Sequence, residues 1–98
     1  MSHEFMLKIN DGDGWSERFD RYPELLRPAT IPFELIPGWG SARILVDGAE
    51  ISFSDEDFGF AVVFESGGLT SKRAEEILRD ICRNIETLTD VTTGIVPL

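Results

Sequence analysis

The chain has 98 residues, of which 18 are acidic and 9 are basic, so its net charge is −9 at neutral pH. This length favours a single domain spanning residues 1–98, since chains usually divide into several domains only when they are much longer. A hydrophobic fraction of 42% permits one compact core and argues against a disordered chain. The acidity disfavours sequence-independent binding to nucleic acid and to anionic membrane surfaces, because both need basic side chains.

The sequence also indicates the cellular compartment and restricts which metals or cofactors the chain could bind. It contains no apolar run of membrane-spanning length, and its first residues lack an apolar signal-peptide core, so we expect a cytoplasmic protein. The single cysteine, Cys82, excludes an internal disulfide and a zinc site built from several cysteines. The turn at Asp11–Gly14 matches a calcium loop only in part, because Ile9 would stand at the first ligand position. We therefore expect no metal and no cofactor.

The first half of the chain predicts short elements. A strand is expected over Phe5–Ile9, near the N-terminus. Aromatic residues at helical spacing within Asn10–Pro28 predict one or two short helical turns, since Pro23 would interrupt a longer helix. A weaker strand is predicted over Ile31–Ile36, and the prolines that bracket it suit the edge of a sheet.

Residues 41–54 are predicted to form a β-hairpin. Asp47-Gly48 favours the two positive-φ positions of a type I′ turn, which places this pair at the tip. The register that follows pairs Ala42 with Phe53, Ile44 with Ile51 and Val46 with Ala49 on one face, and Arg43 with Ser52 and Leu45 with Glu50 on the other. The first face is apolar throughout, and the second is mixed.

Two further strands and a long helix complete the prediction. Residues 59–65 form a third strand after a loop around Ser54–Phe58, which gives a three-stranded meander. Residues 71–88 form an amphipathic helix with Thr70 or Ser71 as its N-cap. Its apolar stripe consists of Ala74, Ile77, Leu78, Ile81, Ile85 and Leu88, with Cys82 at the flank. Its opposite charges pair as Glu75 with Arg79 and Asp80 with Arg83.

A last strand is predicted over Val91–Val96, which is rich in β-branched residues. Together these elements predict an α+β domain of two layers. A mostly antiparallel sheet of four to six strands, with the meander at 41–65, would pack on the helix over 71–88, and the final strand would follow the helix.

The excess of negative charge lies outside the long helix. Residues 1–69 carry a net charge of −8 and residues 70–98 only −1. No basic residue occurs between Arg43 and Lys72. Acidic surfaces favour encounter with basic partners, so we expect a small, non-catalytic binding module of the inhibitor or immunity type that engages a basic protein. The residues expected to bind the partner are Trp39, Glu50, Asp55, Glu56 and Asp57.

Each of these features has another interpretation. The acidic residues can serve solubility alone, and Trp39 can fold back onto the core. Two further functions are open: a homodimer that pairs through Leu45 and Val63 on the outer sheet face, unless residues 15–30 cover them, and a small-ligand pocket with Trp39 as a wall. Catalysis is not expected, because the only histidine, His3, is predicted to lie in a frayed terminus and Cys82 lies beside an apolar stripe.

Overall fold

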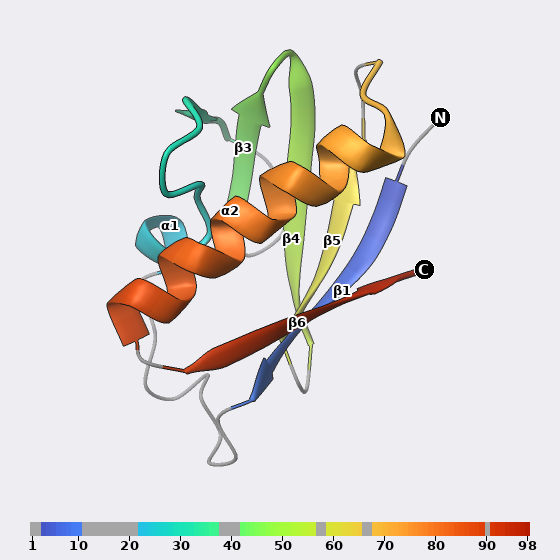
Figure 1. Ribbon diagram of the computed structural model, residues 1–98. Coiled ribbons are helices and arrows are strands. Elements are labelled where there is room, and N and C mark those ends of the chain that lie inside the picture. Colours follow the sequence, from blue (N-terminus) through green and yellow to red (C-terminus); the bar gives the residue numbers. More distant parts are fainter. Residues whose placement is uncertain (1–2, 11–21, 38–41, 57–58, 66–67, 90) are drawn as a thin grey trace.

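The computed structural model describes residues 3–10, 22–37, 42–56, 59–65, 68–89 and 91–98. Within these ranges the chain folds into a six-stranded antiparallel sheet, in the order β2-β3-β4-β5-β1-β6, with helix α2 lying across one face (Figure 1). The elements are β1 (His3–Asn10), α1 (Tyr22–Leu25), β2 (Glu34–Leu35), β3 (Ala42–Val46), β4 (Ala49–Glu56), β5 (Gly59–Phe64), α2 (Ser71–Thr89) and β6 (Thr92–Pro97). The predicted two-layer α+β fold is confirmed.

The hairpin of β3 and β4 forms as predicted. Asp47 and Gly48 have φ angles of 52° and 79°, the positive values that the turn requires. All five predicted residue pairs occur, and β5 continues the meander on the other side of β4. The loop predicted around Ser54–Phe58 was wrong in its first part, because β4 continues to Glu56 and pairs there with Gly59.

Gly59, the first residue of β5, allows this strand to begin in close contact with β1. Its φ is 152°, and a Cβ at this position would collide with the backbone carbonyl oxygen of Leu7 in β1. Only glycine tolerates both the backbone conformation and the contact. The close approach lets β5 pair with β1 along its whole length, from Gly59 opposite Lys8 to Phe64 opposite His3.

The N-terminal strand β1 occupies a central place between β5 and β6. Pairing on both sides extends it from His3 to Asn10, beyond the predicted Phe5–Ile9. The predicted strand over Ile31–Ile36 shrinks to the two residues of β2, which does lie at an edge of the sheet. The last strand, β6, is shifted by one residue from its predicted bounds and forms the opposite edge.

Helix α2 begins at a threonine cap. The Thr70 hydroxyl accepts the N–H of Arg73 at 3.1 Å, and the Thr70 carbonyl accepts the N–H of Ala74 at 3.0 Å. The predicted stripe is buried except for Leu88, whose residue surface is 57% exposed. Leu88 belongs to the predicted stripe but does not join the core, because the last turn of α2 extends past the strands that the rest of the helix covers (Figure 1).

The short helix α1 lies beside α2 on the same side of the sheet (Figure 1). The Asn84 side chain of α2 donates to the carbonyls of Glu24 and Leu25 at 3.0 and 3.1 Å. Pro23 falls in the first turn of α1, where the helix needs no N–H from it. The predicted short turn is confirmed here, while residues 11–21 lie outside the described part of the chain. No helix among the described residues is long and apolar enough to span a membrane.

Candidate protein-binding face

The two faces of the sheet have different surroundings. The inner face holds the core, and both helices pack over it together with Ile31 and Phe33. We call the opposite surface the outer face; none of the residues that the structure describes lies over it. Across the strands its rows are Glu34, Leu45, Glu50 and Glu65; then Arg43, Ser52, Val63 and Glu4; then Ser54, Ala61, Met6 and Val96.

One end of the outer face is acidic. We call the four glutamates Glu4, Glu34, Glu50 and Glu65 the acidic end. Glu4 and Glu34 are exposed, and the side chains of Glu50 and Glu65 are 44% and 26% exposed. They come from three strands, β1, β2 and β4, and from the residue after β5, so the sheet topology brings them onto one surface.

Arg43 links the centre of this face. Its guanidinium is 3.1 Å from the carboxylate of Glu50 and also pairs with Glu65, while its side chain is only 12% exposed. Two carboxylates therefore share one cation, and the cluster keeps a negative charge. Ser52, next to Arg43 in the register, is 1% exposed, and its hydroxyl has no hydrogen-bond partner among the described residues.

Apolar side chains occupy the rest of the outer face. Met6, Leu45, Ala61 and Val63 are partly exposed, and Val96 is 39% exposed. Both residues of the predicted dimer surface, Leu45 and Val63, therefore lie on the outer face, as the hairpin register implied. Of the segment that was to cover them, residues 22–30 pack on the other side of the sheet, and residues 15–21 lie outside the described part.

Of the predicted partner-binding residues that the structure describes, Glu50 lies apart from Asp55 and Glu56. Glu50 lies at the acidic end, whereas Asp55 and Glu56 are the last residues of β4, opposite Phe60 and Gly59. Strands rise by about 3.3 Å per residue, so Glu50 and Glu56 are about 20 Å apart. Trp39 and Asp57 lie outside the described residues.

Sequence reasoning missed Glu4, Glu34 and Glu65. The signal for Glu65 was present, because it follows Val63 by two residues on the predicted third strand. The signal for Glu4 was not, because nothing in the sequence placed β1 beside β5.

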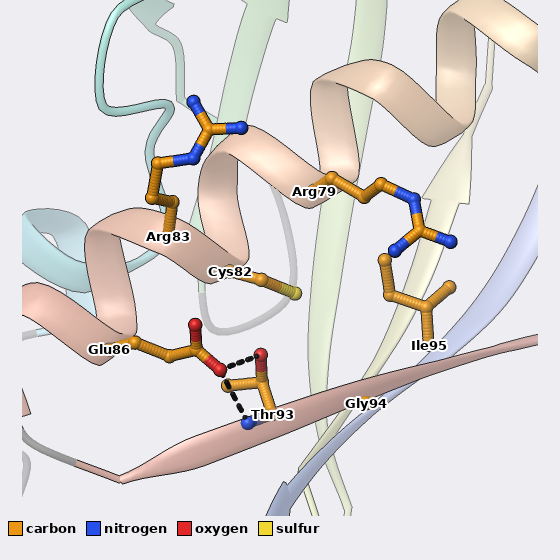
Figure 2. Close-up of a pocket in the computed structure, with 7 residues that line it drawn as sticks. All are labelled: Arg79, Cys82, Arg83, Glu86, Thr93, Gly94 and Ile95. Carbon is orange, nitrogen blue, oxygen red and sulfur yellow. Dashed lines mark hydrogen bonds between the residues drawn. The ribbon is translucent and has the colours of Figure 1, made fainter.

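A cavity of about 280 Å³ lies between α2 and β6 (Figure 2). Its lining residues are Arg79, Cys82, Arg83, Glu86, Thr93, Gly94 and Ile95. Cys82 is 7% exposed, and burial raises the pKa of its thiol, so the thiol stays protonated at neutral pH. This supports the expectation that Cys82 is unreactive. The predicted ligand pocket walled by Trp39 stays a prediction, since Trp39 is outside the described residues.

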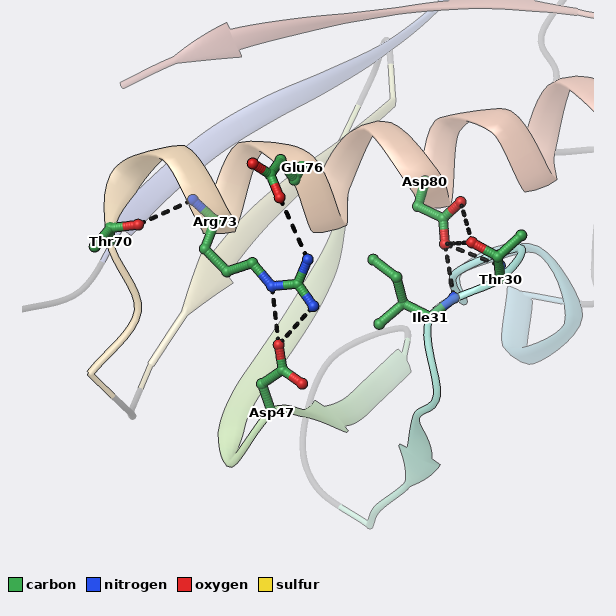
Figure 3. Close-up of polar contacts among 7 residues, drawn as sticks. All are labelled: Thr30, Ile31, Asp47, Thr70, Arg73, Glu76 and Asp80. Atoms are coloured by element: carbon green, nitrogen blue, oxygen red, sulfur yellow. Dashed lines mark hydrogen bonds and ion pairs between the residues drawn. The ribbon is translucent and has the colours of Figure 1, made fainter.

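The charges of α2 balance one another. The helix carries four basic and four acidic residues. Arg73 bridges Asp47 at 2.8 Å and Glu76 at 3.3 Å (Figure 3), and its hydrogen bond with Asp47 raises its pKa. The two predicted pairs form as well, with Arg79 2.8 Å from Glu75 and Arg83 3.1 Å from Asp80.

Asp80 is the buried member of these pairs, with 2% of its surface exposed. Its carboxylate accepts the backbone N–H groups of Thr30 and Ile31 at 2.9 and 3.0 Å (Figure 3). Burial alone would raise the pKa of Asp80, but these hydrogen bonds, together with the Thr30 hydroxyl and the charge of Arg83, outweigh burial and lower it. The carboxylate thereby fastens the segment between α1 and β2 to the long helix.

His3 corrects one expectation. It belongs to β1 rather than to a frayed end, because it pairs with Phe64 across the ladder. Its Nε2 lies 2.9 Å from the carbonyl oxygen of Leu69, and its Nδ1 lies 3.5 Å from the Ser71 hydroxyl. In the described ranges no group of three or more His, Cys, Asp and Glu side chains is placed to hold a metal ion.

Comparison with protein-family models, curated proteins and solved structures finds no significant match to this chain.

Proposed function

We propose that the chain is a non-catalytic binding module whose outer face engages a basic surface of another protein, in the manner of an inhibitor or immunity protein. One observation carries this proposal. Partly exposed apolar side chains lie beside the four glutamates of the acidic end, on a face that none of the described residues covers. Apolar surface with a charged rim is the usual composition of a protein-binding site.

The distribution of charge supports a basic partner. The eight charged residues of α2 cancel, so the helical side of the molecule carries little net charge to attract a partner. By register, the outer face carries the four glutamates of the acidic end and Glu56, against Arg43 and Lys8. A positively charged protein would therefore be steered toward the outer face, and its cations would meet carboxylates on arrival.

The same charges argue against a homodimer through this face. Two copies that met at their outer faces would bring the eight glutamates of their acidic ends to one interface, and Arg43 is already compensated within its own copy. Juxtaposed like charges oppose association. The size of the face is adequate for another protein, because the molecule measures 37 × 25 × 24 Å and a standard interface covers about 800 Å² per partner.

A pair of charge-reversal variants tests the proposal. Glu4→Lys/Glu34→Lys alters two exposed glutamates of the acidic end that form no pair with Arg43. The matched control, Glu75→Lys/Glu76→Lys, changes the net charge by the same amount on the helical side. Each tagged protein is used to capture partners from the native host in low salt, followed by elution with a salt gradient.

We expect the wild type and the control to retain a basic protein that elutes with increasing salt. The outer-face variant should lose it, with at least a tenfold weaker affinity, since each reversed pair at an interface costs about 1 kcal/mol or more. Retention of the same protein by the outer-face variant, or elution that is indifferent to salt, would contradict the proposal.

A further inference from the structure

The edge strand β6 has backbone groups that point away from the sheet, and the register identifies them. The N–H of Leu98 donates to the carbonyl of Glu4 at 3.0 Å, so these two residues form a hydrogen-bonded pair. In an antiparallel ladder such pairs alternate with pairs that are not bonded. Residues 92, 94 and 96 therefore bond to β1, and Thr93, Ile95 and Pro97 direct their backbone groups outward.

Two of these three outward positions offer no free N–H donor. The Thr93 N–H donates to the Glu86 carboxylate at 2.9 Å, and the Thr93 hydroxyl donates to the same oxygen at 3.0 Å (Figure 2). Pro97 has no N–H. The Ile95 N–H is the remaining outward donor of β6, and no described residue accepts it. Glu86, which projects from α2, thus occupies the place that the carbonyl of a neighbouring strand would take.

We propose that the β6 edge is a strand-pairing surface for a second copy of this chain, and that Glu86 keeps it closed. In antiparallel pairing centred on Ile95, each Ile95 N–H donates to the Ile95 carbonyl of the other copy. Each Thr93 N–H would donate to the other copy's Pro97 carbonyl, but only after Glu86 has released it. Such a dimer could form four hydrogen bonds, two between the Ile95 residues and two from Thr93 to Pro97. While Glu86 holds the Thr93 N–H groups, the last two cannot form.

The composition of β6 points to a second copy as the occupant. Thr92–Pro97 contains no charged residue, and the charged side chains that line the cavity beside it are of both signs, Arg79, Arg83 and Glu86, so two copies of this edge would not meet the one-sign repulsion that the acidic end would cause. An uncharged edge strand is the kind of surface that proteins protect against self-pairing. Because β6 and the acidic end are different surfaces, this inference does not depend on the proposed function.

Sedimentation equilibrium of three variants tests the inference. Glu86→Ala removes the acceptor, Glu86→Gln keeps an acceptor oxygen at the same place, and Glu75→Ala removes an exposed carboxylate elsewhere on α2. We expect Glu86→Ala to associate as a dimer at least about tenfold more tightly than the wild type, because two hydrogen bonds become available. Glu86→Gln and Glu75→Ala should behave as the wild type does. Equal association of Glu86→Ala and Glu86→Gln would overturn the inference, as would a folded Glu86→Ala that associates no more than the wild type.

The substitution Glu86→Ala could also weaken the pairing of β6 with β1. Two further measurements distinguish that effect from dimerisation through the β6 edge. Glu86→Ala/Ile95→Pro also lacks the outward N–H of residue 95, and we expect it to return to the association of the wild type; continued dimerisation would show that another surface is responsible. In the wild type, we expect the amide hydrogen of Thr93 to exchange slowly with solvent and that of Ile95 to exchange fast. A protected Ile95 amide in the monomer would contradict the assignment of the open edge.

Discussion

The guanidinium of Arg43 lies 3.1 Å from the carboxylate of Glu50, across the β3–β4 ladder and on the face away from the helix. Glu65 pairs with the same guanidinium. One cation therefore links β3, β4 and the residue that follows β5, which are neighbours in the sheet. This contact separates two roles on the outer face. Arg43 stabilises the sheet, whereas the exposed glutamates around it are the ones that the proposed function assigns to a partner.

Replacing Arg43 with alanine should lower the stability of the fold without removing binding. Two neighbouring carboxylates would lose their shared cation, and we expect a loss of about 1–2 kcal/mol in the free energy of unfolding, measured by urea denaturation. Arg79→Ala is the control, because Arg79 is 64% exposed and pairs only within its helix; it should cost less than about 0.5 kcal/mol. Affinity for a basic partner should be unchanged or higher in Arg43→Ala. A large loss of affinity in the folded variant would mean that Arg43 itself contacts the partner.

Asp80 should make stability depend on pH in the acid range. Its pKa is lowered in the folded state, so its contribution is complete above its ordinary value of 3.8 and is lost as the pH falls below that toward the folded pKa. Asp80→Asn removes this titration, and we expect about 2 kcal/mol of destabilisation at neutral pH because the Thr30 and Ile31 amides lose a charged acceptor. Urea denaturation at several pH values should show the two proteins converging in stability below pH 3.8. A constant difference between them across that range would contradict the role given to the carboxylate.

Gly59 should tolerate no side chain. Gly59→Ala places a Cβ against the carbonyl oxygen of Leu7, and the atoms nearest to it, in Leu7 and Lys8, are all backbone and leave little room to yield. We expect a loss of at least about 3 kcal/mol, or failure to fold, measured by circular dichroism during urea titration. Gly94→Ala is the matched control, since nothing lies within 4 Å of a Cβ at that position. Equal stability of the two variants would show that β5 does not start against β1.

Ser52 should be replaceable by alanine without loss. Its buried hydroxyl has no partner among the described residues, so removing it relieves a desolvation penalty and leaves little empty volume. We expect Ser52→Ala to be as stable as the wild type or more stable by up to about 1 kcal/mol in thermal unfolding. Destabilisation by more than about 1 kcal/mol would mean that the hydroxyl makes a hydrogen bond that matters.

Local patterns in the sequence predicted the elements well. The Asp47-Gly48 turn determines the hairpin register, because a two-residue turn leaves one pairing that puts the apolar side chains other than Leu45 on the same face. The helix over α2 followed from the spacing of its apolar stripe. These predictions succeed because the interactions behind them join residues close together in the chain.

Long-range pairing limited the prediction of the candidate site. Glu4 reaches the acidic end only because β1 inserts between β5 and β6, and no local signal encodes that order. The run at residues 55–57 suggested a compact acidic loop, but strand pairing carries Asp55 and Glu56 into β4, far from Glu50. His3 was misplaced for the same reason, since pairing with Phe64 orders a segment that looks frayed in the sequence.

The central claim, that the outer face is the binding surface, is tested most directly by methyl NMR of the chain in complex with the basic protein that it captures. Outer-face methyl groups of Met6, Leu45 and Val63 report on one side of the molecule, and the exposed Leu88 of α2 reports on the other. We expect large shifts of the three outer-face methyl groups and none at Leu88. Shifts at Leu88 with an unchanged outer face would contradict the claim.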